Sequence, residues 1–551
     1  MKRATALGAV LALVAISGGL LAGCTKPSTE PTTPDTTAAS PTATSGSGTP
    51  SPSASPSPTP TAHADFAWGP TGAQWAAALA AAKALPEDQE IGEVMVVALR
   101  SPDPKAAAAL VTSHHLGGVI LMGGSVPGVS RITALTSAVQ AVGDARGLPV
   151  LIATDEEGGT VSRLSSALPT LPAFMSAGAL GDDAQTQALW TTHARQMRGL
   201  GINVDFAPDS DVTVGLQDPT IRTRSASSDP ARVSSAVVAA SAGLEAGGVV
   251  PVIKHFPGHG SATSNSHMSL AYVSEPLTTL KKRDFAPFKA SIAAGAPVVM
   301  MGHLVVGEWG SLPASVNPAA YAYLRGPLGF DGITITDALD MKGVTDIYPP
   351  GTVEAKALEA GADVLLMPKN VDVAIAGIRK ALASGALTKE RLDDAAAMTM
   401  LLAQWQTSLT PATGALTSDT AVSAASDVVA AKDCSALVGD SVSITGGTSV
   451  ERARLGAALT GAGVDVKTGA AAATADTSIA LLSSDTKGAH ADVVVALAGP
   501  WALAASDADV YVAAWGHAIP QLNAVARVLT QAGTAHGTWP VKLNLPYAVC
   551  E

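Results

Sequence analysis

The feature that most constrains the fold is a series of eight short apolar segments, each followed by a polar loop and a stretch with helical periodicity. In chain order these segments are residues 93–99, 118–122, 150–154, 202–207, 249–253, 298–301, 332–336 and 362–367. Strands that are apolar throughout and alternate with helices are typical of a parallel sheet. Eight such units over about 300 residues predict a (β/α)8 barrel of the TIM type. Periodicity alone leaves an open, doubly wound sheet as the alternative.

Ionisable residues lie in or directly after five of these segments, and they help to choose between the two folds. They are Asp155, Asp205, Asp209, Lys254, His255, His303 and Asp337. Taken singly, each is readily explained as a solvated loop residue or a helix cap. Together they favour the barrel, because residues at the C-terminal ends of many strands converge only when the sheet closes. Barrel enzymes carry their active sites at that face.

The first 65 residues have the composition of an export signal and a tether. A basic start is followed by an apolar stretch, and Leu-Ala-Gly-Cys then ends at Cys24, which resembles a bacterial lipobox. Residues 25–65 contain no Leu, Ile, Val, Met or aromatic residue, so we expect a disordered linker. We therefore predict an exported protein, anchored through lipid on Cys24 to the outer face of the cell membrane. The alternatives are a plain signal peptide with an incidental Cys and an uncleaved anchor helix.

The chain has three cysteines, Cys24, Cys434 and Cys550. If Cys24 carries lipid, the two that remain in an exported protein predict a disulfide between Cys434 and Cys550. The alternative is a pair of buried free thiols.

A second series of predicted strands and helices begins at about residue 417. Segments 440–445, 477–482, 492–497, 509–514 and 540–543 are typical of strands, with helical stretches between them. We predict a barrel domain over residues 66–410, a junction near 408–417, and a smaller α/β domain over 418–551. The second domain contains no phosphate-binding loop or metal motif.

The charge balance excludes one class of partner. With 34 Lys and Arg against 46 Asp and Glu, the net charge is −12, which argues against non-specific nucleic-acid binding. Beyond the N-terminus no uninterrupted apolar run is long enough to cross a membrane. The hydrophobic content of 47% is ample for a large core.

The densest motif covers residues 254–260, Lys-His-Phe-Pro-Gly-His-Gly, and is followed by Asn265-Ser266-His267. Two of its histidines are four apart, as in zinc-binding helices. The intervening Pro-Gly prevents a helix, and no Glu follows the first His, so we expect no metal and no other cofactor. Two further motifs, residues 155–159 and 336–341, each follow or end a predicted strand.

These three motifs resemble those of the glycoside hydrolase family 3 β-N-acetylglucosaminidases. Further blocks agree in the same order, at residues 201–208, 224–225, 228–230 and 360–368. The resemblance covers roughly residues 88–405. It extends more weakly into the second domain, which shorter members of the family lack.

The resemblance implies a role for each matching position. Asp337 matches the nucleophile, which forms a glycosyl-enzyme that water resolves with net retention. His267 matches the acid/base, because an imidazole near neutral pH can protonate a leaving oxygen and then deprotonate water. The side chains expected to bind substrate are Asp155, Arg224, Lys254, His255, His303 and Met341.

Three positions depart from the family pattern. Asn265 stands where the family carries an Asp as partner of the acid/base, so the partner here is neutral. Thr160 replaces a usual Arg and Ala226 a usual Phe, which we interpret as changes in packing or at the rim of the site.

The leading hypothesis is a lipid-anchored retaining glycosidase that removes terminal β-linked N-acetylglucosamine from peptidoglycan fragments, in peptidoglycan recycling. The partners would be the carbohydrate and the membrane, with no nucleic acid, and the protein would be a monomer. One alternative is a family 3 enzyme for another β-sugar, or a phosphorylase, since a neutral Asn265 repels phosphate less. The other is a wall-sugar-binding protein whose catalysis Asn265 has impaired.

Overall fold

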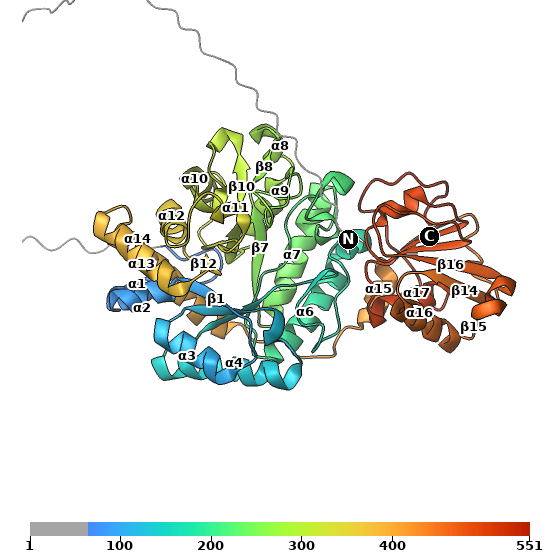
Figure 1. The fold of residues 1–551 in the computed structure, drawn as a ribbon, viewed down its shortest axis with the longest axis horizontal. Coiled ribbons are helices and arrows are strands. Elements are labelled where there is room, and N and C mark those ends of the chain that lie inside the picture. Colours follow the sequence, from blue (N-terminus) through green and yellow to red (C-terminus); the bar gives the residue numbers. More distant parts are fainter. Residues whose placement is uncertain (1–63, 551) are drawn as a thin grey trace, which may run out of the picture. The chain divides into compact units, whose positions relative to one another are not determined.

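The structure is a computed structural model that describes residues 64–550. The predicted export signal, Cys24 and nearly all of the predicted tether lie outside the described residues. Figure 1 shows the described chain as a first domain of strands and helices, coloured blue to yellow, followed by a second sheet domain in orange and red.

The first domain is built on eight parallel strands. They are β1 (Met95–Leu99), β2 (Gly118–Leu121), β3 (Leu151–Thr154), β6 (Val204–Asp205), β7 (Val250–Phe256), β9 (Val298–Met301), β11 (Ile333–Thr336) and β12 (Leu365–Leu366). They are hydrogen-bonded in the order β11-β9-β7-β6-β3-β2-β1-β12. A parallel bridge between Ile335 and Val364 joins the two ends of this sheet. The ring therefore closes, which confirms the predicted barrel and excludes the doubly wound alternative.

Helices follow the strands and surround them (Figure 1). They are α3 (Pro104–His114), α4 (Val129–Arg146), α6 (Asp183–Gly199), α7 (Pro230–Ala246), α9 (Phe285–Ala293), α10 (Pro318–Arg325), α12 (Thr352–Ala360), α13 (Val371–Ser384) and α14 (Lys389–Trp405). Two further helices, α1 (Gly72–Lys83) and α2 (Glu87–Glu93), precede the first strand. Local sequence sets the start of α3, α6 and α7. At these positions the side chains of Asp103, Asp182 and Asp229 each accept a hydrogen bond from a backbone N–H in the first turn of the helix.

The barrel strands are buried on both faces. Every residue of β7 is buried, as are those of β2 and β9. This explains why these segments are continuously apolar in the sequence and do not alternate with polar residues. A polar residue at the end of such a strand is consequently held by a rigid, fully packed element.

The loops at the C-terminal ends of the strands carry additional small elements. A hairpin of β4 (Glu156–Gly158) and β5 (Val161–Ser162), then α5 (Met175–Leu180), follow β3. After β7, β8 (Ala271–Val273) and α8 (Leu277–Leu280) follow a long loop, and β8 pairs with β10 (Leu304–Val306). After β11 comes the short helix α11 (Lys342–Thr345). These elements form the upper edge of the barrel around the candidate site.

The second domain contains a six-stranded sheet in the order β13-β18-β17-β16-β14-β15. Its strands are β13 (Val428–Ala431), β14 (Ser441–Gly446), β15 (Asp465–Val466), β16 (Thr477–Leu482), β17 (Val493–Ala496) and β18 (Val510–Ala513). Its helices are α15 (Asp419–Ser426), α16 (Ser449–Gly461) and α17 (Ile519–Leu529). All ladders are parallel except that between β13 and β18. Four of the five predicted strands are present, whereas β13 and β15 were not predicted.

The predicted strand at residues 540–543 is wrong. Pro540 has no N–H to donate to a ladder, and its carbonyl accepts hydrogen bonds from Ser228 N at 3.2 Å and Ser227 Oγ at 2.5 Å. Val541 is buried nearby. This segment therefore fastens the second domain to the barrel and does not extend the sheet.

A disulfide joins Cys434, which follows β13, to Cys550, with the two Cα atoms 5.6 Å apart. The backbone N–H of Cys550 also donates to Val429 O at 2.8 Å. The last described residue is thus attached to the edge of the second sheet.

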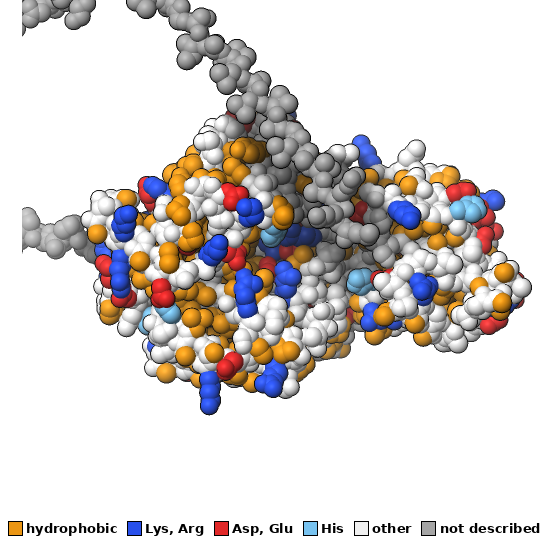
Figure 2. Space-filling model, in the orientation of Figure 1, with side chains coloured by type: hydrophobic (Ala, Val, Ile, Leu, Met, Phe, Trp, Pro, Cys, Tyr) orange, Lys and Arg blue, Asp and Glu red, His pale blue; other side chains and the backbone are white. Residues whose placement is uncertain are grey.

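The surface in Figure 2 shows Lys and Arg side chains spread over the visible face, many of them beside acidic residues. Among residues 64–550, no helix is both long enough and apolar enough to cross a membrane.

Candidate active site

The C-terminal ends of the barrel strands surround a cavity of about 360 Å³. Its ionisable lining consists of Asp155, Glu157, Arg163, Arg224, Lys254, His255, His267, Asp337 and Asp340 together with Arg100. Its apolar lining includes Ile120, Met122, Met300, Met341, Leu366 and Met367. The structure therefore brings together seven of the nine residues predicted for the site. A cavity of this size with both polar and apolar walls is within the range of small-molecule sites.

Asp337 follows β11 directly and is largely buried. Its backbone N–H donates to Met301 O at 2.9 Å, and its Oδ1 accepts from Ala338 N at 2.8 Å. Burial by itself would raise the pKa of Asp337. The imidazoles of His303 and His255 and the Ala338 N–H outweigh burial and hold this pKa below its usual value. The carboxylate is therefore ionised at neutral pH, as a nucleophile must be.

His303 was predicted to bind substrate, and this is corrected by its position. Its side chain is fully buried, with Nδ1 2.7 Å from Ser315 Oγ and Nε2 2.9 Å from Ala338 O. Because a carbonyl can only accept, Nε2 carries the proton, and Nδ1 accepts from the serine hydroxyl. Both ring nitrogens are thus in use, and His303 supports the backbone next to Asp337 from behind the cavity.

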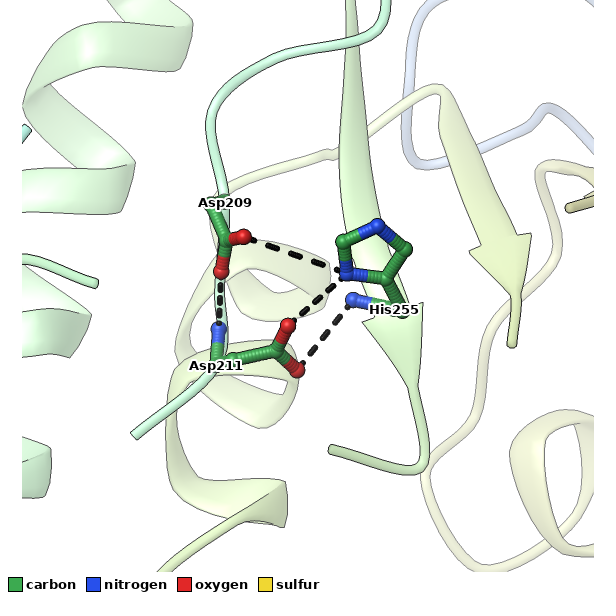
Figure 3. A group of neighbouring side chains, drawn as sticks. All are labelled: Asp209, Asp211 and His255. Carbon is green, nitrogen blue, oxygen red and sulfur yellow. Dashed lines mark hydrogen bonds and ion pairs between the residues drawn. The ribbon is translucent and has the colours of Figure 1, made fainter. Parts of the chain in front are cut away.

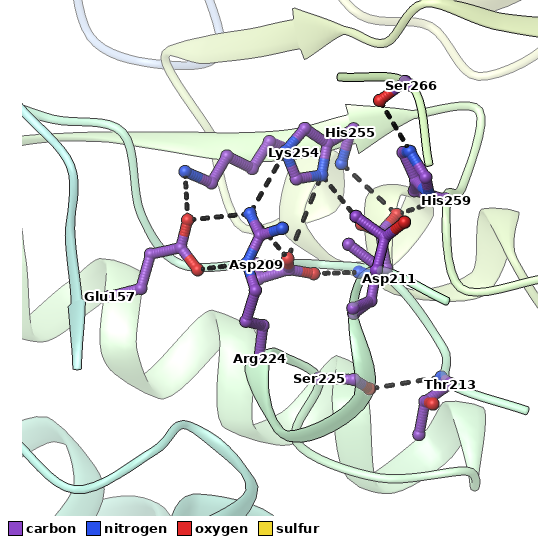
Figure 4. A network of polar contacts seen from close by, with 12 residues as sticks. Glu157, Asp209, Asp211, Thr213, Arg224, Ser225, Lys254, His255, His259 and Ser266 are labelled. Carbon is purple, nitrogen blue, oxygen red and sulfur yellow. Dashed lines mark hydrogen bonds and ion pairs between the residues drawn. The ribbon is translucent and has the colours of Figure 1, made fainter. Parts of the chain in front are cut away.

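Glu157 is the centre of a buried charge network that lines the same cavity (Figure 4). It accepts from Arg224 Nε at 2.7 Å and Nη2 at 2.9 Å, and it contacts Lys254 Nζ. Asp209 lies 3.5 Å from Arg224 Nη2. Two cations and their carboxylates are therefore locked together, and their remaining donors face the cavity.

The electrostatics of this network keep Glu157 and Lys254 charged. Burial would raise the pKa of Glu157, but Arg224 and Lys254 outweigh burial and hold it well below its usual value. Burial would lower the pKa of Lys254, yet Glu157 and Asp155 raise it above its usual value. The cavity is consequently lined by a fixed ammonium and a fixed guanidinium.

Asp155 lies at the cavity wall, with its Oδ1 3.3 Å from Lys254 Nζ and its Oδ2 3.9 Å from Arg163 Nε. Its side chain remains 19% exposed, compared with 2% for Lys254. Its oxygens are thus accessible from the cavity, and its role in binding a sugar hydroxyl stays a prediction.

His255 is fixed by the acidic residues behind it. Its Nδ1 lies 2.8 Å from Asp211 Oδ2 (Figure 3), and its Nε2 lies 3.4 Å from Arg224 Nη2. Burial lowers the pKa of His255 to about 4, and burial raises the pKa of Asp211 to about 7. The imidazole is therefore neutral, with its proton on Nδ1 facing the carboxylate, and Nε2 is left as the acceptor for Arg224 Nη2.

Asp209, Asp211 and His255 place their ligand atoms within 4.8 Å of one another, an arrangement that could also hold a cation. The geometry fits a hydrogen-bonded cluster better. Asp211 Oδ2 lies at hydrogen-bond distance from His255 Nδ1, and the guanidinium of Arg224 already faces Asp209. Burial, together with the charge of Asp211, raises the pKa of Asp209 well above its usual value, so this pair retains a proton.

Asp205, a second acidic residue at the end of β6, does not line the cavity. It is fully buried and accepts from the backbone N–H of Glu156 at 2.9 Å. Burial raises its pKa well above the usual value. It anchors the start of the β4–β5 hairpin and so positions Asp155 and Glu157 indirectly.

His267 lines the cavity together with Asp337 but lies in the exposed part of the loop between β7 and β8. Asn265 Oδ1 accepts a hydrogen bond from the backbone N–H of His267 at 2.9 Å. The contact expected between Asn265 and the imidazole is thus not the one that the structure shows. An amide oxygen accepts from a backbone N–H as a carboxylate oxygen does, so Asn265 shapes the turn that presents His267.

Four residues of the site were not assigned by sequence reasoning. They are Glu157, Asp211, His259 and Ser266. Glu157 and His259 lie inside recognised motifs and Ser266 within the Asn-Ser-His sequence, so their positions were visible but their partners were not. Asp211 gave no signal, because it lies beyond the end of a strand in an unremarkable loop.

Comparisons with known proteins agree with this geometry. Residues 87–401 match the Glycosyl hydrolase family 3 N terminal domain. The chain is 36% identical over 318 residues to beta-hexosaminidase LpqI of Mycobacterium tuberculosis, covering 56% of this chain and 80% of that protein. It is 32% identical to beta-hexosaminidase A of Pseudoalteromonas piscicida, over 53% of this chain and 54% of that one.

Two solved structures show where the similarity extends. A family 3 glycosyl hydrolase of Mycobacterium smegmatis is 34% identical, with a TM-score of 0.54, over 58% of this chain and 97% of its own. A family 3 β-N-acetylglucosaminidase of Paenibacillus has a TM-score of 0.74 at 24% identity, and covers 84% of this chain and 99% of its own. The second comparison shows a shared fold that includes the C-terminal sheet domain. From these matches and the geometry of its barrel, the chain belongs to glycosyl hydrolase family 3 and is a glycosidase.

Proposed function

We propose that this protein is an exo-acting β-N-acetylglucosaminidase that works with net retention of anomeric configuration. The observation that carries the proposal is that Asp337 and His267 line the same cavity, which is otherwise walled by a fixed array of sugar-binding groups. The relatives named as β-hexosaminidases support the choice of sugar.

In the first step the Asp337 carboxylate attacks the anomeric carbon while the imidazolium of His267 protonates the leaving oxygen. The glycosidic bond breaks and a glycosyl ester forms on Asp337. In the second step neutral His267 takes a proton from water, which attacks the same carbon and releases Asp337 as a carboxylate. Two displacements at one carbon give net retention.

The wall around Glu157 accounts for binding of the sugar. Asp155 offers acceptors to hydroxyl protons, whereas Arg224 and Lys254 offer donors to hydroxyl oxygens. Their buried ion pairs prevent them from moving aside. A wall held rigid in this way suits recognition of a terminal sugar, which favours an enzyme that removes terminal residues.

The proposal is tested with nitrophenyl glycosides of GlcNAc, GalNAc and glucose, each with and without phosphate. We expect hydrolysis of the GlcNAc compound, a β-configured first product by NMR, and a 2-deoxy-2-fluoro sugar trapped on Asp337. A free sugar 1-phosphate as the main product would indicate phosphorolysis instead. Binding of GlcNAc without any turnover would indicate a sugar-binding protein.

We propose further that the enzyme acts outside the cell on cell-wall fragments while anchored by lipid on Cys24. The Leu-Ala-Gly-Cys sequence and the Ser/Thr/Pro-rich stretch after it support this location. Labelling with a palmitate analogue should mark the membrane fraction of the wild type and not of Cys24→Ser. An unlabelled, soluble wild-type protein would contradict it, whatever the enzyme's activity.

A further inference from the structure

The catalytic loop between β7 and β8 is attached to the barrel next to its exposed histidine. Ser266 precedes His267 and is 98% buried. Its Oγ lies 2.9 Å from His259 Nε2, and its carbonyl oxygen accepts from Gly343 N at 3.0 Å. Ser266 therefore docks on two separate elements, the start of its own loop and the short helix α11.

His259 is itself held firmly. Its backbone N–H donates to Asp211 Oδ1 at 2.6 Å, and its ring lies edge-on to that of His255, with 5.8 Å between centroids. Burial lowers the pKa of His259 to about 3, so the ring is neutral. In the described chain, Ser266 is the hydrogen-bond partner of its Nε2, while its buried Nδ1 has none.

These contacts form one chain from the sugar-binding wall to the acid/base. Asp211 binds the imidazole of His255 and the backbone of His259, and His259 binds Ser266, whose neighbour is His267 (Figure 4). We propose that the His259–Ser266 hydrogen bond is a latch that positions His267 for proton transfer. The proposal rests on the assignment of His267 as the acid/base.

The latch matters because the loop is otherwise lightly held at its tip. His267 and the next residue, Met268, are exposed, with Met268 at 68%. The Asx turn made by Asn265 sets the local shape of the tip but attaches it to nothing else. A misplacement of about 1 Å at a reacting group can lower a rate by about 10²-fold. Ser266 and His259 are thus positioning residues that act through His267.

The test compares Ser266→Ala with Ser266→Thr, which restores a hydroxyl, and with Ser264→Ala as control. Ser264 lies on the same loop, and its hydroxyl donates to Leu270 O at 3.2 Å without touching His259. Each variant is assayed on nitrophenyl-GlcNAc and on the disaccharide of β-linked GlcNAc. A nitrophenolate leaves with little protonation, whereas a sugar alkoxide needs the proton from His267.

We expect Ser266→Ala to lose about tenfold to 10²-fold in kcat/KM on the disaccharide, within the range of general acid catalysis. The loss on nitrophenyl-GlcNAc should be a few-fold, and Ser266→Thr should recover most of both. Azide should speed nitrophenyl turnover by Ser266→Ala and give the glycosyl azide, because azide displaces Asp337 from the anomeric carbon without a base. Ser264→Ala should match the wild type in every assay.

Equal losses on the two substrates, or no loss in Ser266→Ala, would overturn the latch. So would a Thr variant that folds normally and stays as impaired as the Ala variant. A wild-type enzyme without hydrolysis of either substrate would instead overturn the proposed function. Thermal unfolding of each variant separates loss of the latch from loss of the fold.

Discussion

The two walls of the cavity are built in opposite ways. The wall proposed to bind the sugar contains Glu157, Arg224 and Lys254, which are buried and connected by ion pairs. The wall proposed to supply the acid/base contains His267 on an exposed loop, attached through one buried serine. The first wall positions its groups by a dense charge network, and the second by a small number of neutral hydrogen bonds.

This difference indicates which part of the site is rigid and which part can adjust its position. A sugar ring is recognised by many groups, so a rigid wall suits it. The acid/base must serve both the leaving oxygen and the incoming water, so a loop that is held at one point allows adjustment. Substitutions should therefore separate the two walls by their effects on KM, on stability and on the dependence upon leaving group.

The largest effect is expected between the walls, at the nucleophile. Asp337→Ala should lower kcat by at least about 10⁴-fold on every substrate, because the covalent step is lost. Weak sugar binding, measured by calorimetry with GlcNAc, should persist because the sugar-binding wall is unchanged. Asp346→Ala, which removes an exposed ion pair with Lys342, serves as control. Near wild-type kcat in Asp337→Ala would show that another group is the nucleophile.

The second effect concerns the rigid wall. Glu157→Gln leaves Arg224 and Lys254 without their shared carboxylate and should cost about 3–5 kcal/mol of unfolding free energy. KM should rise for both substrates by similar factors. Chemical denaturation and kinetics measure the two quantities. The exposed pair of Glu359 with Lys356 offers the control, since Glu359→Gln should cost under about 1 kcal/mol. A stable Glu157→Gln with unchanged KM would contradict the rigid wall.

The third effect concerns the docking of the loop. A Cβ at Gly343 would lie 2.7 Å from Ser266 O, so Gly343→Ala must push the loop away from α11. We expect about a tenfold loss of disaccharide hydrolysis and a smaller loss with nitrophenyl-GlcNAc. Gly461→Ala, where a Cβ meets nothing within 4 Å, should leave both activities unchanged. Full activity in Gly343→Ala would mean that the loop does not need this contact.

The smallest effect is expected at Asn265. In Asn265→Asp the carboxylate can accept from the backbone N–H of His267, as the amide oxygen does. The turn is therefore kept and only a negative charge is added. The anion favours the protonated imidazole, so the pH limb that His267 sets should move to higher pH. Disaccharide hydrolysis should rise by a few-fold, and more than nitrophenyl hydrolysis. Identical pH profiles for the two enzymes would show that Asn265 acts on the backbone alone.

Much of the barrel could be predicted from sequence. A strand buried on both faces is mostly apolar, so each of the eight strands has a local signal, even though β6 includes Asp205 and β7 includes Lys254 and His255. The two edge strands of the second sheet, β13 and β15, were not predicted, and they show the limit of this reasoning. β15 has two residues, Asp465 and Val466, and its pairing with β14 leaves no local pattern. Segment 540–543 is apolar enough for a strand but packs against the barrel instead.

The sequence by itself determined which residue types stand at the strand ends and which of them bear catalytic chemistry, because motif spacing and strand ends are local properties. Only the tertiary structure decided their partners. It places the His303 ring against the Ala338 carbonyl next to Asp337, and the Asp211 carboxylate against the His255 ring. A hydrogen bond depends on where a side chain points within about 3 Å, and residues far apart in the chain meet at that range only after the barrel has closed.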